Sequence, residues 1–132
     1  MSFPMLTQAQ NQKRGKRLGL SIASYRRGSR FYSEEFPAWK NALDVLDHCK
    51  SLKAGCLQIG VRGWTRDFAG KVRERRENLD IRLEGQISLP RKDSDIDRFD
   101  ETVRMAKEAG ATVLRTVCLG GRRYETFKKL ED

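Results

Sequence analysis

One stretch near the middle of the chain, residues 81–90, constrains the fold more than any other part of the sequence. It reads Ile-Arg-Leu-Glu-Gly-Gln-Ile-Ser-Leu-Pro, so apolar and polar residues alternate along it. Because successive side chains of a strand point to opposite faces, this pattern predicts a strand with one apolar and one polar face. Helical patterns flank it, so we expect helices on the apolar face and a partly polar barrel interior on the other. The apolar phase consists of Ile81, Leu83, Ile87 and Leu89, and the polar phase of Arg82, Glu84, Gln86 and Ser88.

Three further segments have strand character, and with residues 81–90 they give four strands separated by helical patterns. We expect these strands at residues 18–23, 56–61 and 111–119. Parallel strands need crossovers of a dozen or more residues, which the intervening helices supply. An open parallel sheet of four strands would leave its polar face uncovered, whereas an eight-unit barrel takes about 250 residues. The sequence therefore predicts an α/β fold with about four βα units, which is half of a (β/α)8 TIM barrel.

The helices are predicted from stripes of apolar residues at spacings of three and four. The first begins near Pro37 and ends at a left-handed cap on Gly55, and the second begins at Asp67. A third is capped by Asp93 or Ser94 and stopped by Gly110, and residues 126–132 begin a fourth. The stripe of the first helix is Phe36, Trp39, Leu43, Leu46, Cys49 and Leu52; that of the second is Phe68, Val72 and Leu79; that of the third is Ile96, Phe99, Val103 and Ala106.

The formal net charge of +9 is concentrated at one end of the chain. Residues 1–30 hold seven basic side chains and no acidic ones, whereas the remainder is close to neutral. We expect residues 1–16 to be a basic, disordered arm, and we favour a solvated tail over a phosphate-binding one. No run of 18 apolar residues exists, and the apolar segment at residues 18–23 is shorter than a secretory signal, so we expect a cytoplasmic protein without a membrane span.

The three cysteines lie at positions that fit neither a disulfide framework nor a zinc site. Cys49, Cys56 and Cys118 are scattered, odd in number and without Cys-x-x-Cys spacing. Each lies in an apolar context, and free cysteine is among the most buried residue types. We expect all three to be reduced side chains of the core.

Four segments, taken in strand–helix order, resemble the sugar phosphate isomerase/epimerase family, whose members have a xylose isomerase-like TIM barrel. They are Lys-Ala-Gly-Cys-Leu-Gln-Ile at residues 53–59, Leu-Glu-Gly-Gln-Ile-Ser-Leu-Pro at 83–90, Lys-Glu-Ala-Gly-Ala-Thr at 107–112 and Gly-Gly-Arg-Arg-Tyr-Glu at 120–125. The resemblance covers residues 17–127, and it implies that residues 17–132 are the N-terminal half of such a barrel, truncated after the fourth strand. It also implies proton transfer on a sugar, sugar phosphate or polyol, with a divalent metal such as Mn, Mg, Co or Zn holding two substrate oxygens.

In that family the metal ligands and the acid/base carboxylates lie mainly on the later strands. This chain has one histidine, His48, inside a predicted helix, where we expect a structural role. No metal ligand is therefore assigned in this chain, and the ligands are expected in the missing half. We expect the chain to be incomplete for catalysis, either as a fragment or as one half that needs a partner half or a second copy.

The catalytic face of a TIM barrel is built at the carboxyl ends of its strands, which selects the candidate substrate-binding residues. After a Gly-Gly turn, Arg122 and Arg123 offer bidentate forks to an anionic group. Trp64 is a candidate for stacking on a sugar ring, although we favour a loop aromatic that covers the barrel rim. The full set of predicted substrate-binding residues is Arg122, Arg123, Tyr124, Gln86 and Trp64.

Glu84 and Arg115 form a second predicted constellation, a pair of opposite charges inside the barrel. A structural ion pair is favoured over a catalytic role, because unpaired buried charge is costly and Glu84 lies well before the end of its strand. Glu84 is nevertheless the one catalytic candidate that the sequence offers.

Two other classes of function compete with sugar chemistry. Metal-dependent DNA repair endonucleases share this type of barrel, and the basic N-terminal arm could follow a phosphate backbone. The near-neutral body and the lack of a histidine cluster argue against nucleic acid as a partner. The other alternative is a non-catalytic half-barrel that serves as an assembly module, because its open sheet edges would favour self-association.

Overall fold

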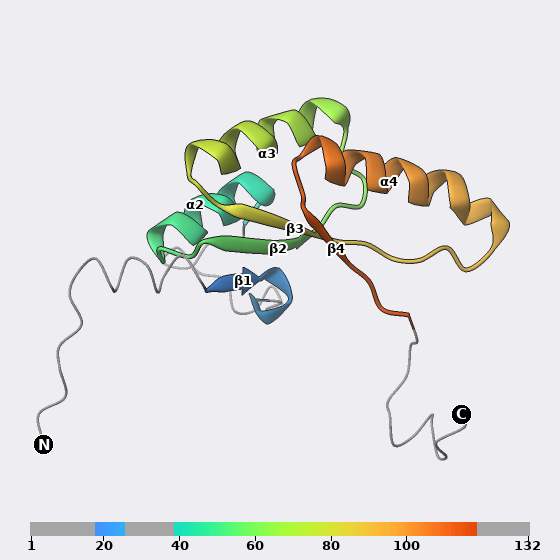
Figure 1. Ribbon diagram of the computed structural model, residues 1–132, viewed down its shortest axis with the longest axis horizontal. Helices are drawn as coiled ribbons and strands as arrows, with labels where there is room; N and C mark the ends of the chain where they lie inside the picture. Colours follow the sequence, from blue (N-terminus) through green and yellow to red (C-terminus); the bar gives the residue numbers. More distant parts are fainter. Residues whose placement is uncertain (1–17, 26–38, 119–132) are drawn as a thin grey trace, which may run out of the picture.

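The computed structural model describes residues 18–25 and 39–118, and in these ranges four parallel strands form one sheet (Figure 1). Neighbouring strands in the sheet are also neighbours in the chain, in the order β1-β2-β3-β4. The strands are β1 (Gly19–Ser21), β2 (Cys56–Gly60), β3 (Arg82–Gln86) and β4 (Val113–Arg115). The α/β class and the parallel sheet that the sequence predicts are therefore confirmed.

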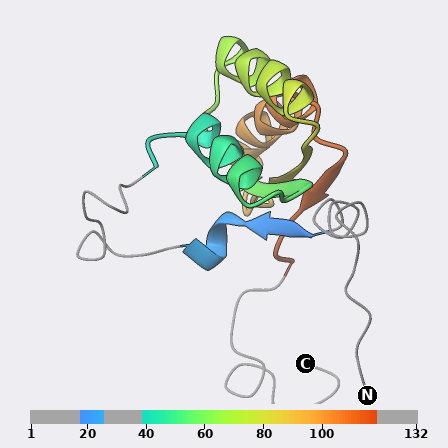
Figure 2. The same cartoon turned by 90° about the vertical axis from the view of Figure 1, so that its left-hand side faces the viewer.

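In the described ranges three α-helices connect the strands, and all three lie on the same side of the sheet (Figure 2). They are α2 (Ala42–Ser51), α3 (Arg66–Asn78) and α4 (Ile96–Glu108). Short 3₁₀ turns follow β1 at Ile22–Tyr25 and precede α4 at Asp93–Asp95. No described helix or strand covers the opposite face of the sheet, so within these ranges only one face of the sheet is covered.

The alternation that defines residues 81–90 is present in the structure. Leu83 and Gly85 are buried beneath the helices, whereas Arg82 is exposed and Glu84 is half-buried on the other face. Strand β3 ends earlier than the sequence predicts, because β4 pairs with it only as far as Gln86. The last backbone hydrogen bond between the two strands is donated by Ile87 N–H to Arg115 O. Leu89, placed in the apolar phase by the sequence, is exposed, and the prediction for it is wrong.

The first and last strands are also shorter than predicted. β1 ends at Ser21, where the chain turns into a 3₁₀ turn, and β4 spans Val113–Arg115 instead of residues 111–119. Each of them has one neighbouring strand in the described ranges, so only the residues opposite that neighbour have ladder partners. The predicted N-terminal arm and fourth helix lie outside the described residues.

Helix α2 differs from its prediction at both ends. Its N-cap is Asn41, whose side-chain oxygen accepts a hydrogen bond from Leu43 N–H at 2.8 Å. The left-handed conformation after the helix falls on Lys53, with φ 56°, and not on Gly55, whose N–H instead donates to Leu18 O beside β2. Leu52, predicted as part of the buried stripe, is the C-cap residue after the last residue of α2 and is 52% exposed, so the prediction for it is wrong. Phe36 and Pro37 lie outside the described residues.

Helices α3 and α4 begin at different residues from those predicted. Helix α3 begins at Arg66 and not at Asp67, and Thr65 is its cap, because its hydroxyl oxygen accepts a hydrogen bond from Phe68 N–H. The predicted caps Asp93 and Ser94 lie in a 3₁₀ turn, and α4 starts at Ile96, one or two residues later than predicted, without a side-chain cap. Ile96, the first residue of α4, is exposed, which corrects the predicted stripe of this helix.

The core lies between the helices and the sheet. Its fully buried side chains come from two helices and two strands. They are Val45, Leu46 and Cys49 in α2, Leu57 in β2, Val61 just after β2, Val72 in α3 and Leu83 in β3. At about 25 cal/mol for each Å² of apolar surface removed from water, this layer is the main source of stability in the described fold.

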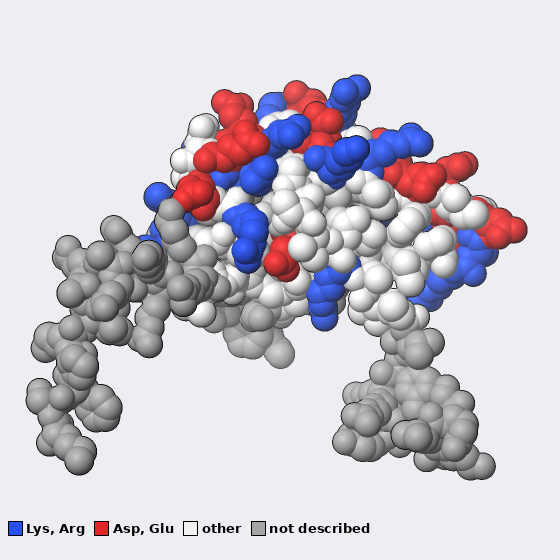
Figure 3. All heavy atoms as spheres, viewed as in Figure 1, with Lys and Arg blue, Asp and Glu red and all other residues white. Residues whose placement is uncertain are grey.

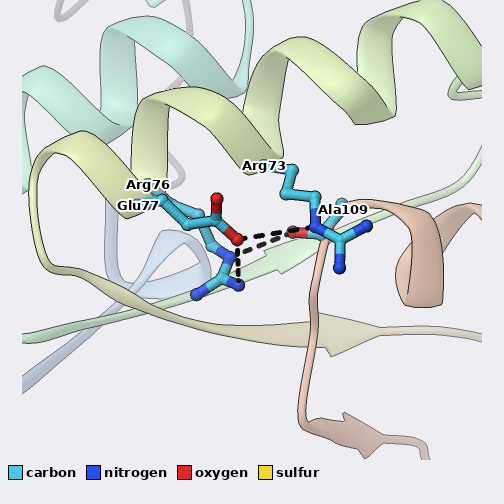
Figure 4. Close-up of polar contacts among 4 residues, drawn as sticks. All are labelled: Arg73, Arg76, Glu77 and Ala109. Atoms are coloured by element: carbon cyan, nitrogen blue, oxygen red, sulfur yellow. Dashed lines mark hydrogen bonds and ion pairs between the residues drawn. The ribbon is translucent and has the colours of Figure 1, made fainter.

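A polar junction fastens the end of α4 to α3 (Figure 4). Arg76 Nε donates a hydrogen bond to Ala109 O at 3.1 Å, and Arg76 Nη2 lies 3.2 Å from Glu77 Oε1. Arg73 Nε lies 3.5 Å from the same carboxylate oxygen. The sequence-predicted stop, Gly110, has φ 76° and leaves space that the Arg76 guanidinium occupies. A glycine is thus required here both by backbone conformation and by the close approach of the arginine.

Candidate functional site

A row of hydrogen-bonded side chains crosses the face of the sheet that the helices leave uncovered. Ser21, Gln58 and Glu84 are partners in the register of β1, β2 and β3, so they lie side by side on this face. Ser21 Oγ donates to Gln58 Oε1 at 3.1 Å, and Gln58 Nε2 donates to Glu84 Oε2 at 3.3 Å. All three are half-buried. This polar row holds a carboxylate in a defined orientation and still offers further acceptor positions on its oxygens.

The predicted pair of Glu84 and Arg115 lies on this same face, but the two side chains are offset. Glu84 is the partner of Val113, and Arg115 is the partner of Gln86, one step further along the sheet. Among the described side chains, no ion pair joins Glu84 to Arg115; Glu84 instead accepts from Gln58, and Arg115 is exposed. The carboxylate is therefore held by an amide and not by a guanidinium.

Two of the three cysteines are buried near the polar row and the core. Burial, and to a smaller degree the nearby Cys56, raises the pKa of Cys49 from 9.0 to about 11. Burial also raises the pKa of Cys56, and a hydrogen bond from Arg82 opposes that shift. Cys118 is exposed, because it follows the end of β4 beyond the cover of the helices, so the prediction of three core cysteines is wrong for this one. All three thiols are free.

The carboxyl ends of β2 and β3 meet at a small cavity of about 70 Å³. Predicted site residue Gln86 lines it together with Ser88, and Arg62 reaches it from the end of β2. Arg98 and Thr102 of α4 complete its polar lining, and Arg98 Nη2 lies 3.0 Å from Asp95 Oδ1. The cavity is large enough for a small polar group rather than for a whole sugar ring.

Two groups of predicted substrate-binding residues lie elsewhere. Trp64 packs edge-on against Phe68, with ring centroids 5.4 Å apart and an interplanar angle of 82°, and both rings contact the core. This geometry is that of a packed aromatic pair. Residues 122–124, which hold Arg122, Arg123 and Tyr124, lie outside the described residues.

A larger cavity, of about 390 Å³, lies at the opposite, amino end of the strands. Its charged lining is mixed: Arg76 and Arg82 are basic, and Glu77 and Asp80 are acidic. It adjoins the junction between α3 and α4, and in (β/α) folds this end of the sheet serves stability rather than chemistry.

The described residues do not assemble a metal centre. In residues 18–25 and 39–118, no group of three or more His, Cys, Asp or Glu side chains is placed to hold a metal ion. His48 is half-buried on α2, with its ring centroid 4.9 Å from that of Trp39, which agrees with the structural role expected for it.

Sequence reasoning missed Ser21 and Gln58 as members of the candidate site. A signal for Gln58 was present, since it occupies the polar phase between Leu57 and Ile59. Its partnership with Ser21 depends on strand register, which the spacing of residues along one strand does not reveal.

The fold and the polar row define this chain as an α/β protein with a sequentially ordered parallel sheet, helices on one face and a polar opposite face. Comparison with protein-family models, curated proteins and solved structures found no match to it. Within the part of the chain that the structure describes, no helix has the length and apolar character needed to cross a membrane.

Proposed function

We propose that this chain forms half of the wall of a (β/α)8 barrel that binds a sugar or sugar phosphate, as in sugar phosphate isomerases and epimerases. The observation that carries the proposal is the polar row of Ser21, Gln58 and Glu84 on the face opposite the helices. In a closed barrel that face becomes the interior, and its end at the carboxyl termini of the strands, where Ser21 lies as the last residue of β1, adjoins the place where substrate binds. Hydroxyl, amide and carboxylate groups are suited to the alternating donors and acceptors of a polyol.

The strand order supports this architecture. Strands in the order β1-β2-β3-β4, all parallel and with every described helix on one side, match consecutive units of a barrel wall. A doubly wound sheet would reverse its strand order at a switch point and place helices on both faces. The resemblance of residues 17–127 to the isomerase/epimerase family points in the same direction.

The divalent metal that the resemblance implies does not fit the described residues alone. On the polar face the register places one carboxylate, Glu84, and one thiol, Cys56, and the thiol has a raised pKa that disfavours the thiolate a metal needs. We therefore assign sugar recognition to this half and derive no catalytic step from it. The finer location that accompanies the family resemblance, the cytoplasm, is part of the same proposal.

Calorimetric titration of the chain tests the proposal. The ligands are a panel of aldoses, ketoses and their phosphates, with inorganic phosphate alone as a reference for simple anion binding. At least one sugar or sugar phosphate is expected to bind, and Glu84→Gln is expected to weaken that binding by about tenfold, because a charge-assisted acceptor is lost.

The matched control is Glu74→Gln, which removes the same charge from an exposed position on α3. It is expected to leave binding unchanged. Binding of inorganic phosphate alone, salt-sensitive retention of DNA without sugar binding, or equal effects of the two substitutions would each contradict the proposal.

A further inference from the structure

The small cavity at the carboxyl ends of β2 and β3 differs in charge from two larger cavities. Its lining holds the basic residues Arg62 and Arg98 and one acidic residue, Asp95, so basic charge is in excess. The cavity of about 390 Å³ at the amino end of the strands is lined by two basic and two acidic residues. A cavity of about 350 Å³ beside α2 and α3 also has two of each, and these are Lys71, Arg75, Asp47 and Glu74. Of the three cavities, the smallest is the one suited to an anion.

Charges on the helices are mixed in sign, unlike those of this cavity. On the face shown in Figure 3, Lys and Arg side chains lie among Asp and Glu side chains over the helices. Arg75 pairs with Asp47, and Lys71 pairs with Asp67. Within the described ranges, no carboxylate forms an ion pair with Arg62. Its guanidinium therefore supplies uncompensated positive charge to the cavity.

Asp95 holds the second arginine in place. Asp95 Oδ1 lies 3.0 Å from Arg98 Nη2, and Asp95 Oδ2 accepts a hydrogen bond from Arg91 N–H at 3.1 Å. The side chain of Asp95 is 16% exposed, whereas that of Arg98 is 61% exposed. Because a guanidinium carries several N–H donors and this contact engages one of its nitrogens, Arg98 keeps donors for a second acceptor. Both oxygens of the one acidic side chain are thus already in use.

Neutral donors and a suitable size complete the cavity. Gln86 is the last residue of β3, and Ser88 follows it in the lining. In the part of the chain that the structure describes, neither side chain has a hydrogen-bond partner, so an amide and a hydroxyl are available to donate. A water molecule needs roughly 10–15 Å³ of cavity space. A cavity of about 70 Å³ therefore has room for a small oxyanion such as phosphate.

The cavity adjoins the polar row on the same face of the sheet. Gln86 lies two residues after Glu84 in β3, so the two residues share a face and are roughly 6–7 Å apart along the strand. The carbon chain of a sugar phosphate spans that distance. Glu84 does not line the cavity, and its carboxylate accepts a hydrogen bond from Gln58. An anionic group in the cavity would therefore leave the polar row free for hydroxyl groups.

We propose that this cavity binds the phosphoryl group of a phosphorylated sugar. Arg62 and Arg98 are its charged donors, and Gln86 and Ser88 are its neutral donors. The sugar then lies along β3 with its hydroxyl groups towards Glu84. The inference rests on the sugar binding of the proposed function and narrows its ligand to phosphate esters.

Calorimetric titration of matched ligand pairs tests the site. Ribose and fructose, with the other aldoses and ketoses, are each compared with their own terminal phosphate ester, and inorganic phosphate is titrated separately. At least one ester is expected to bind about tenfold or more tightly than its parent sugar, with inorganic phosphate as a weak competitor. Arg62→Gln and Arg98→Gln are each expected to weaken binding of the ester by about tenfold and to leave binding of the parent sugar unchanged.

The matched control is Arg104→Gln. Arg104 lies on α4 like Arg98 and forms the same kind of ion pair with a residue three positions earlier, Glu101, at 3.7 Å. By the helical period, the lining residues of α4 share one face of the helix and Arg104 lies on the opposite face. Arg104→Gln is expected to leave the affinity of every ligand unchanged. All three arginines are exposed, so each variant retains the fold, which circular dichroism verifies.

The outcomes separate this inference from the proposed function. Equal binding of a sugar and its ester, or equal weakening by Arg62→Gln and Arg104→Gln, would overturn the phosphoryl site and leave sugar binding standing. Binding of inorganic phosphate that Arg62→Gln weakens, without any sugar or ester bound more tightly, would show an anion site but reject the sugar and with it the proposed function.

Discussion

The two faces of the sheet are built from the same strands but have opposite characters. In β3, Leu83 points into the layer beneath the helices and is fully buried, whereas its neighbour Glu84 points the other way and bonds to Gln58. The covered face is held by apolar contacts with three helices, and the polar face by hydrogen bonds between half-buried side chains. Burial on one face thus accounts for the fold, and the other face is available for recognition.

The largest test of this contrast compares two adjacent residues. Leu83→Ala is expected to lower the free energy of unfolding by about 2–5 kcal/mol, because it removes a fully buried side chain and leaves a cavity. Glu84→Ala is expected to lower it by about 1 kcal/mol or less, since it removes one hydrogen bond on a half-buried face. Urea unfolding followed by circular dichroism measures both. Equal losses would mean that the polar face also carries the fold.

The attachment of α4 to α3 gives a second test, on the helix-covered side. Gly110→Ala is expected to destabilise the fold by about 1–2 kcal/mol, because residue 110 has a positive φ and the new Cβ would meet the Arg76 guanidinium. Gly70→Ala, in the interior of α3 with open space at its Cβ position, is expected to stabilise it by about 0.5–1 kcal/mol. Thermal unfolding of the two variants resolves the difference in sign, and a loss of stability in both would contradict the role given to the junction.

The smallest effect concerns the buried thiol of Cys49 on α2. Its folded pKa of about 11 exceeds the ordinary value of 9.0, so the unfolded chain ionises first. The stability that this thiol contributes is complete below pH 9 and is lost as pH rises towards 11, by about 1 kcal/mol between about pH 8 and about pH 10.

Cys49→Ala provides the control for this pH dependence. Urea unfolding at the two pH values is expected to give a smaller pH-dependent loss in the variant than in the parent chain, by the same amount. An identical pH dependence in both proteins would show that Cys49 ionises without cost in the folded state and that the helix-covered face is wetter there than its burial indicates.

Several features of this fold could be predicted from single segments. The alternation in residues 81–90 correctly separated Leu83 from Glu84, and Gly110 correctly marked the end of a helix. The errors fall at element ends: Gly55 was assigned a cap that Lys53 provides, and Leu89 was assigned to a strand that has no partner at that point. Ends are set by which neighbour is present, and a local pattern contains no information about the neighbour.

Period-two and helical patterns are enough to specify the order of strands and helices in the described ranges and, away from element ends, which side of each element is apolar, because hydrophobic periodicity acts over a few consecutive residues. The polar row, in contrast, depends on residues that are far apart in the sequence. Its two hydrogen bonds join residues 37 and 26 positions apart, so they exist only once three strands have settled into one register. Register is chosen by the packing of the opposite face against the helices, and that choice belongs to the tertiary structure.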